Sequence, residues 1–283
     1  MILVTGANGM VGSYVSEVFG ANNVIMTDLP EMDVTDKKKV FSLVERYKPE
    51  FVLHLAAETD VDKCETEIDH AFRSNTIGTQ NVALACQKTG AVMIYISTGG
   101  IFNGAMGKVH TEFDVPDPQN VYSRSKYQGE LIVKDLLNEF FIFRAGWMIG
   151  GGPGKDRKFV GKIIEFCRTK DTIEAVNDKY GSPTFARDFL SGIKETIKTG
   201  EYGLYHMVNS GGSCTRFDIA VEISRILKKN IVVKPVTSER FPLPAKRADS
   251  EAMKNYKLEL MGRNIMPDWK KSLSEYVVEF LAK

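Results

Sequence analysis

Short apolar runs alternate along the first half of the chain with longer segments whose apolar residues recur every three or four positions. Five runs predict buried strands; they are residues 2–5, 24–27, 51–57, 92–97 and 140–145. Four segments with the helical period lie between them, at residues 11–19, 37–47, about 71–88 and about 121–138. Because each segment is long enough for a crossover, the alternation predicts an α/β fold with a doubly wound, parallel Rossmann sheet.

The pattern changes near residue 150. Residues 150–154 are mostly glycine and predict a loop, and residues 235–244 are rich in proline and polar side chains. We therefore expect a dinucleotide-binding domain over residues 1–150 and a smaller C-terminal lobe formed mainly by residues 151–283. Part of 172–210 is expected to complete the sheet of the first domain.

Charge and composition exclude several classes of function. Lys and Arg number 37 against 36 Asp and Glu, so no bulk field attracts nucleic acid or an anionic membrane, and we expect neither as a partner. No apolar run approaches a membrane span, and too few residues precede Gly6 for a secretory signal. The cysteines and histidines show no metal-binding spacing. We expect a cytoplasmic protein without a metal.

Three glycines lie between the first predicted strand and the first predicted helix. Glycine at this turn permits a positive φ, a close approach of the backbone to a ligand, and close packing of helix and strand. The helix N-terminus then faces the pyrophosphate of a dinucleotide. The expected contacts are Gly6, Asn8, Gly9, Met10, Val11 and Gly12. A purely structural turn is the alternative.

An acidic residue follows the second predicted strand. Asp28 comes 22 residues after Gly6, close to the spacing of about 20 for a carboxylate that binds the adenosine ribose. Its charge would repel a 2′-phosphate and favour NADH, unless Asp28 is an ordinary solvated loop residue. Asp33 and Val34 are candidate contacts of the adenine.

A tyrosine and a lysine four residues apart open the fourth predicted helix. Tyr122 and Lys126 lie on one face of it, where the ammonium would lower the pKa of the phenol and make it a usable proton donor. Thr98 ends the strand at 92–97, at the sheet edge where ligands bind. We expect a catalytic group of Thr98, Tyr122 and Lys126; a surface pair on a helix is the alternative.

Together these motifs resemble the extended short-chain dehydrogenases/reductases, to which Ala56-Ala57 and Asn75 add further matches. More narrowly, the chain resembles the dTDP-4-dehydrorhamnose reductase branch of that family. The segments that carry this resemblance are residues 55–65, 120–126, 143–147, 177–184 and 205–211. They span nearly the whole chain in the family's order.

The resemblance implies hydride transfer from NADPH or NADH to the 4-keto carbon of a nucleotide-linked 6-deoxy sugar, with dTDP-4-dehydrorhamnose as substrate. It implies that Tyr122 protonates the substrate, that Lys126 holds the nicotinamide ribose, and that Thr98 bonds the substrate or Tyr122. Further cofactor contacts would be Leu55, Ala56, Ala57 and Thr59. Trp147 would contact the sugar, with a core aromatic between the lobes as the alternative, and Arg247 would contact the diphosphate, with a solvated arginine as the alternative. These contacts make the smaller lobe the substrate-binding lobe. A homodimer is left open.

The sequence departs from the family pattern in three ways. Gly99 and Gly100 stand where Asp and Tyr are usual, Ala248 replaces a proline, and the loop at 150–158 is longer. We expect the two glycines to open space beside the reacting sugar carbon, so that Gly99→Asp would improve reduction of dTDP-4-dehydrorhamnose. The alternatives are a nucleotide-sugar epimerase, another keto-sugar reductase, or a cofactor-binding regulatory subunit without catalysis.

Overall fold

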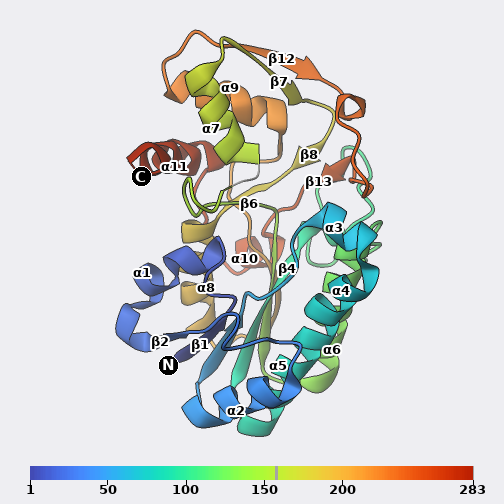
Figure 1. The fold of residues 1–283 in the computed structure, drawn as a ribbon, viewed down its shortest axis with the longest axis vertical. Coiled ribbons are helices and arrows are strands. Elements are labelled where there is room, and N and C mark those ends of the chain that lie inside the picture. Colours follow the sequence, from blue (N-terminus) through green and yellow to red (C-terminus); the bar gives the residue numbers. More distant parts are fainter. Residues whose placement is uncertain (157–158, 283) are drawn as a thin grey trace.

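The computed structural model describes residues 1–156 and 159–282. Its centre is a six-stranded parallel sheet in the order β10-β5-β4-β3-β1-β2 (Figure 1). The strands are β1 (Ile2–Thr5), β2 (Val24–Met26), β3 (Phe51–His54), β4 (Val92–Thr98), β5 (Phe140–Ala145) and β10 (Gly203–His206). The chain reverses its direction across the sheet between β1 and β3, and the carboxyl ends on either side of such a switch point form a ligand crevice. The Rossmann-type α/β fold expected from the sequence is therefore present.

Helices cover both faces of this sheet because its strands are apolar on both sides. One core cluster packs α1 (Val15–Phe19) and α8 (Ala186–Ile197) against the sheet. The opposite cluster contains residues of α2 (Lys37–Tyr47), α5 (Gly78–Thr89) and α6 (Val121–Leu136). Two elements from beyond residue 150, α8 and β10, thus complete the central layer. The domain boundary at residue 150 stays a prediction.

A smaller layer lies beyond the carboxyl ends of the strands, at the top of Figure 1. Its core is formed mainly by α7 (Phe159–Thr169), α9 (Arg216–Ile226) and α11 (Trp269–Ala282). Its strands are β6 (Trp147–Ile149), β7 (Thr172–Val176), β8 (Tyr180–Gly181), β9 (Pro183–Phe185), β11 (Cys214–Thr215), β12 (Val232–Val236) and β13 (Ser250–Glu251). The short α10 (Tyr256–Leu260) returns to the central sheet, where it contacts β10. Of the helices described, none is long and apolar enough to cross a lipid bilayer.

The main differences from the predicted elements concern the third helix and the third strand. The helix expected at about 71–88 is divided into α4 (Ile68–Phe72), a π-helical turn at Arg73–Ile77, and α5. The strand expected at 51–57 ends at His54, and the Ala56 amide bonds the side-chain hydroxyl of Thr5 instead of a backbone carbonyl. The first helix begins as a 3-10 turn, Val11–Tyr14. The remaining ends differ by one or two residues, which is the usual uncertainty of such boundaries.

Candidate active site

The glycine-rich turn after β1 packs directly against the turn after β3. Gly6 has a φ of 66°, and a Cβ on it would lie 2.6 Å from the backbone nitrogen of Ala56. A Cβ on Gly12 would lie 2.0 Å from the carbonyl oxygen of Ala7. Side chains at these two positions are therefore excluded, while Asn8 and Gly9 between them are exposed. Because a 3-10 turn and the five-residue α1 follow, the helix dipole here is smaller than the sequence suggested.

Asp28 lies against the same turn. Its Oδ2 accepts a hydrogen bond of 2.7 Å from the backbone N–H of Asn8. The predicted ribose carboxylate is thus held beside the predicted pyrophosphate turn. Asp33 is less available, because its Oδ1 accepts bonds from both the amide and the hydroxyl of Thr35. Val34 is buried.

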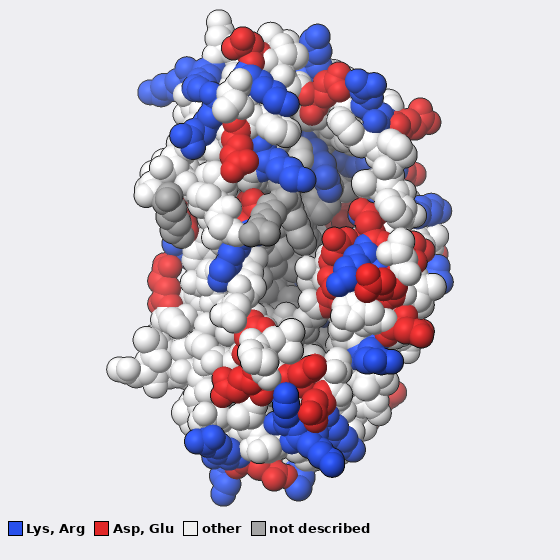
Figure 2. Space-filling model, in the orientation of Figure 1, with Lys and Arg blue, Asp and Glu red and all other residues white. Residues whose placement is uncertain are grey.

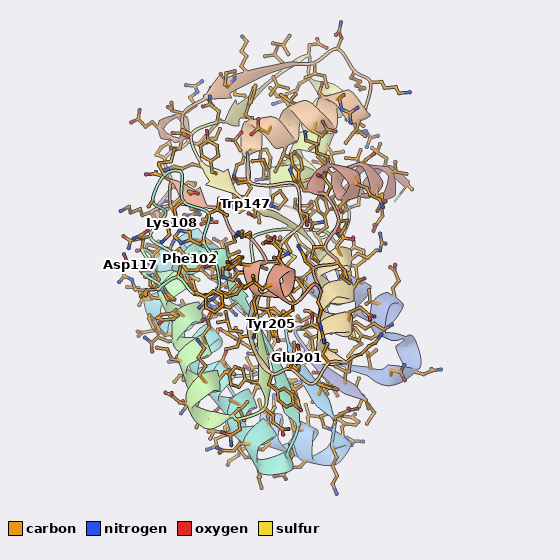
Figure 3. All side chains as sticks on the ribbon, turned by 180° about the vertical axis from the view of Figure 1, so that it is seen from behind. Phe102, Lys108, Asp117, Trp147, Glu201 and Tyr205 are labelled. Carbon is orange, nitrogen blue, oxygen red and sulfur yellow. The ribbon has the colours of Figure 1, made fainter. Side chains whose placement is uncertain are left out.

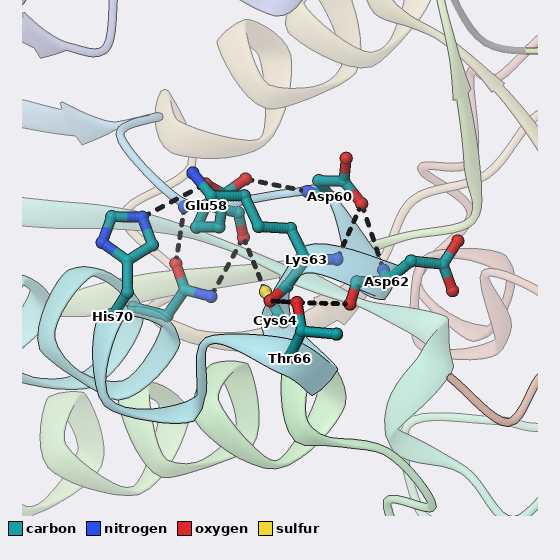
Figure 4. A network of polar contacts seen from close by, with 8 residues as sticks. Glu58, Asp60, Asp62, Lys63, Cys64, Thr66 and His70 are labelled. Carbon is teal, nitrogen blue, oxygen red and sulfur yellow. Dashed lines mark hydrogen bonds and ion pairs between the residues drawn. The ribbon is translucent and has the colours of Figure 1, made fainter. Parts of the chain in front are cut away.

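The loop after β3 is fixed by a network around Glu58 (Figure 4). Lys63 and His70 donate to Glu58 Oε2 at 3.0 Å and 3.2 Å. Burial acts to raise the pKa of Glu58, but the hydrogen bonds from the Asp60 amide, Lys63 and His70 lower it overall. Asn75 accepts from the Glu58 amide at 2.8 Å and donates to its carbonyl at 3.0 Å. This network sets the course of the loop that carries Leu55, Ala56, Ala57 and Thr59.

The same asparagine connects this loop to the predicted catalytic helix. Its Nδ2 donates at 3.0 Å to the hydroxyl of Ser125 on α6. The N-terminus of α6 is held by two further groups: Asn120 Oδ1 accepts from the Ser123 amide at 2.9 Å, and Glu65 Oε2 accepts from the Val121 amide at 3.0 Å. Such caps satisfy amides that lack helical partners. They fix the first turn of α6, which carries Tyr122.

Tyr122 and Thr98 meet at the carboxyl edge of the sheet. Burial raises the pKa of Tyr122 above its ordinary value, and a hydrogen bond from Thr98 acts in the opposite direction. The charge of Glu251 also raises this pKa. In the cofactor-free protein burial is thus the dominant effect on the pKa of Tyr122, and the expected lowering by Lys126 stays a prediction.

Lys126 is buried beside an aromatic ring. Lys126 is only 4% exposed, and its Nζ lies 4.3 Å from the centre of the Tyr95 ring. Burial lowers the pKa of Lys126 to about 7, and the nearby Glu130 carboxylate opposes that shift. Among residues 1–156 and 159–282 the ammonium has no hydrogen-bond acceptor. A donor with unused capacity at this sheet edge fits the hydroxyl groups of a cofactor ribose.

The side chains expected to contact substrate come from the smaller layer. Trp147 lies where that layer meets the central sheet (Figure 3), and its Nε1 donates at 3.0 Å to Glu251 Oε2. The guanidinium of Arg216 lies 5.5 Å from the indole. Arg247 is not freely available for a diphosphate, because its Nη2 forms an ion pair of 2.9 Å with Asp62.

The space expected at Gly99 and Gly100 is filled. A Cβ on Gly99 would lie 2.7 Å from Met253 Cε, and one on Gly100 would lie 2.8 Å from Ser123 Oγ. Met253 is buried, with its amide and carbonyl both bonded to the Ser182 hydroxyl. The prediction of an opened pocket is therefore wrong: Met253, two residues beyond β13, and Ser123 of α6 occupy the volume. Of the other departures, the loop at 150–158 includes residues 157–158, which lie outside the described residues.

The face of the molecule beside these groups is hollowed, as Figure 2 shows. Basic side chains lie along the upper part of the hollow, and acidic ones gather over α3 (Val61–Thr66) and α4. Sequence reasoning missed two charged residues of this region, Glu251 and Arg216. No local motif surrounds either residue, so only the fold could place them beside Trp147.

Comparison with known proteins agrees with this architecture. The family profile described as "RmlD substrate binding domain" matches residues 1–282. A dTDP-4-dehydrorhamnose reductase from Aggregatibacter actinomycetemcomitans is 30% identical over 289 residues, which cover 96% of each chain.

Two crystal structures of dTDP-4-dehydrorhamnose reductases are similar over almost their entire lengths. The protein from Clostridium acetobutylicum is 37% identical with a TM-score of 0.94, covering 100% of this chain and 99% of that one. The protein from Bacillus anthracis, in complex with NADP, is 35% identical with a TM-score of 0.93, covering 98% of both.

Proposed function

We propose that this chain, which belongs to the RmlD substrate binding domain family, reduces the 4-keto group of a nucleotide-linked 6-deoxy sugar with NADPH or NADH. The proposed substrate is dTDP-4-dehydrorhamnose and the product dTDP-rhamnose. The observation that carries the proposal is the group formed by Thr98, Tyr122 and the buried Lys126 at the carboxyl edge of a Rossmann sheet. A cytoplasmic location and a homodimer stay predictions.

The residues present fit the dinucleotide. The glycine turn exposes Asn8 and Gly9, and the Lys126 ammonium has no hydrogen-bond acceptor in the described chain. When bound, the dinucleotide supplies the hydride. In the proposal the turn holds its pyrophosphate, Asp28 binds the adenosine ribose, and Lys126 binds the nicotinamide ribose.

The chain's own part in the reaction is to position the sugar and to deliver a proton. As the keto carbon is reduced, its oxygen needs a proton, which the Tyr122 phenol donates. The raised pKa of Tyr122 keeps the phenol protonated through neutral pH, which is the form that reduction requires. Thr98 orients the phenol, while Trp147 packs against the sugar.

The test is the oxidation of NADPH and NADH, followed by absorbance, with a panel of dTDP-, UDP- and GDP-linked 4-keto sugars. We expect the dTDP-linked 6-deoxy sugar to be reduced with the highest kcat/KM. Tyr122→Phe should lower turnover by roughly 10² to 10⁴, the usual contribution of a general acid, with little change in NADPH affinity. Tyr127→Phe, on the same helix, is the matched control.

Two outcomes would contradict the proposal. If Tyr122→Phe turns over at the wild-type rate, the phenol is not the proton donor. If none of the sugars is reduced although NADPH binds, the regulatory-subunit alternative is favoured over catalysis.

A further inference from the structure

Glu251 reaches the candidate site from a two-residue strand of the smaller layer. It pairs in register with Gly181 of β8. The Trp147 indole lies flat against that glycine, since a Cβ on Gly181 would be 2.2 Å from Trp147 Cε2. This packing brings the Glu251 carboxylate beside the indole, where Oε2 accepts the bond from Trp147 Nε1 at 3.0 Å. One carboxylate oxygen is thereby fixed.

The other oxygen lies close to the predicted catalytic group. Glu251 Oε1 is 3.6 Å from the position that a Cβ on Gly100 would take, and Thr98 Oγ1 is 3.4 Å from the same point. The charge of Glu251 also acts on the Tyr122 phenol. The oxygen is therefore within a few ångströms of the groups proposed to serve the reacting carbon.

Two polar groups near Gly100 have no hydrogen-bond partner within the described part of the chain. No donor within the described part of the chain bonds Glu251 Oε1, and the buried hydroxyl of Ser123 also lacks a partner there. Arg216 and Arg247 stabilise the carboxylate by charge, although neither is within ion-pair distance of it in the described structure. Glu251 is partly exposed, so its second oxygen is open to a donor from a bound ligand.

We propose that Glu251 determines substrate specificity: its Oε1 accepts a hydrogen bond from a sugar hydroxyl on the carbon next to the keto group. The proposal rests on the proposed reductase function and adds the recognition of that hydroxyl. Gly99 and Gly100 present no side chains to the sugar on this side, so the carboxylate is supplied by β13. Trp147 holds the carboxylate in place while Oε1 faces the substrate.

Two substrates and two variants test this inference. The substrates are the dTDP-linked 4-keto-6-deoxy sugar and its analogue lacking the hydroxyl next to the keto group. For the wild type, loss of that hydroxyl should lower kcat/KM roughly 10- to 150-fold, the range for a hydrogen bond to a charged group. Glu251→Gln keeps an acceptor for Trp147 but removes the charge. It should lose most of this discrimination, while binding dTDP alone as the wild type does.

The second variant separates recognition from packing. If Glu251 only positions Trp147, Glu251→Ala will lower kcat/KM equally for both substrates, and the inference is overturned. It is also overturned if Glu251→Gln discriminates between the two sugars as strongly as the wild type. Glu239→Gln, an exposed residue of the same layer, is the control. A wild type that reduces neither sugar overturns the proposed function itself, and this inference with it.

Discussion

Replacing Lys126 by methionine is expected to stabilise the cofactor-free protein at neutral pH, even though it removes a residue of the proposed catalytic group. The ammonium is almost fully buried, and burial lowers its pKa from 10.5 to about 7, against the opposing effect of Glu130. In the unfolded chain the lysine regains its ordinary pKa. Methionine keeps a flexible stem without the charge, and its sulfur suits the ring of Tyr95.

The sign of the pH dependence follows from the protons bound in each state. Between about pH 7 and pH 10.5, unfolding takes up a proton at Lys126, so the free energy of unfolding of the wild type rises with pH in this window. Below pH 7 the destabilising contribution is constant and at its largest. The difference of 10.5 minus 7, or about 3.5 pKa units, corresponds at pH 7 to about 4 kcal/mol.

Imperfect packing of the new side chain reduces that gain. We therefore expect Lys126→Met to raise the free energy of unfolding by about 2 to 4 kcal/mol at pH 7. Between pH 7 and pH 10 this advantage should shrink by about 3 kcal/mol, because the cost of removing the proton from the lysine on folding falls as the pH approaches 10.5. This change with pH is more diagnostic than the difference in stability at pH 7, because the cost of a packing defect does not vary with pH.

Urea unfolding of the cofactor-free wild type and variant at pH 7, 8.5 and 10 measures both quantities. Lys271→Met, at an exposed position of α11, is the control and should change little. Added NADPH should stabilise the wild type more than Lys126→Met, because ligand stabilises in proportion to its affinity. If Lys126→Met is less stable by the same amount at every pH, the lysine is not held in its neutral form and the reasoning is refuted.

Three further substitutions test the cofactor and substrate sides. Asp28→Asn keeps an acceptor for the Asn8 amide but removes the charge, so the ratio of kcat/KM for NADPH to that for NADH should rise roughly tenfold; an unchanged ratio would show that the carboxylate does not face the ribose. Gly99→Asp should destabilise the fold by about 1 to 3 kcal/mol through its contact with Met253, and should lower kcat/KM, as unfolding and kinetic assays will show. Arg247→Gln tests whether the ion pair with Asp62 opens to the diphosphate: it should then raise the KM for the nucleotide sugar about tenfold without changing that for NADPH, and equal effects on both would exclude a diphosphate contact.

The central fold is largely predictable because its information is local. The strands are continuous apolar runs, and the helices between them carry the helical period, so each element is recognisable without its neighbours. The division of the third helix is different. It accompanies the bonds of the Asn75 amide to the Glu58 backbone and to Ser125, and neither partner can be inferred from the periodicity of the helix.

The candidate site likewise has parts that local motifs predict and parts that depend on contacts between distant segments. The glycine turn and the pair at Tyr122 and Lys126 are local motifs, and the sequence placed them on the correct elements. The contacts of Arg247 with Asp62 and of Glu251 with Trp147 join segments more than 100 residues apart. Filling of the volume at Gly99 by Met253 is of the same kind. A missing side chain in a sequence therefore does not imply a cavity in the fold, because distant segments pack into the volume.

Burial acts on both members of the proposed catalytic pair, and it moves their pKa values in opposite directions. It raises the pKa of the Tyr122 phenol and lowers that of the Lys126 ammonium, because in each case the charged form is the one that loses its hydration. The cofactor-free site thus favours a protonated phenol beside a lysine close to losing its charge. Hydroxyl groups placed at Lys126 would supply the acceptors that the described residues lack and would favour the ammonium again. The same desolvation that destabilises the empty site therefore becomes affinity for a ligand that completes its bonding.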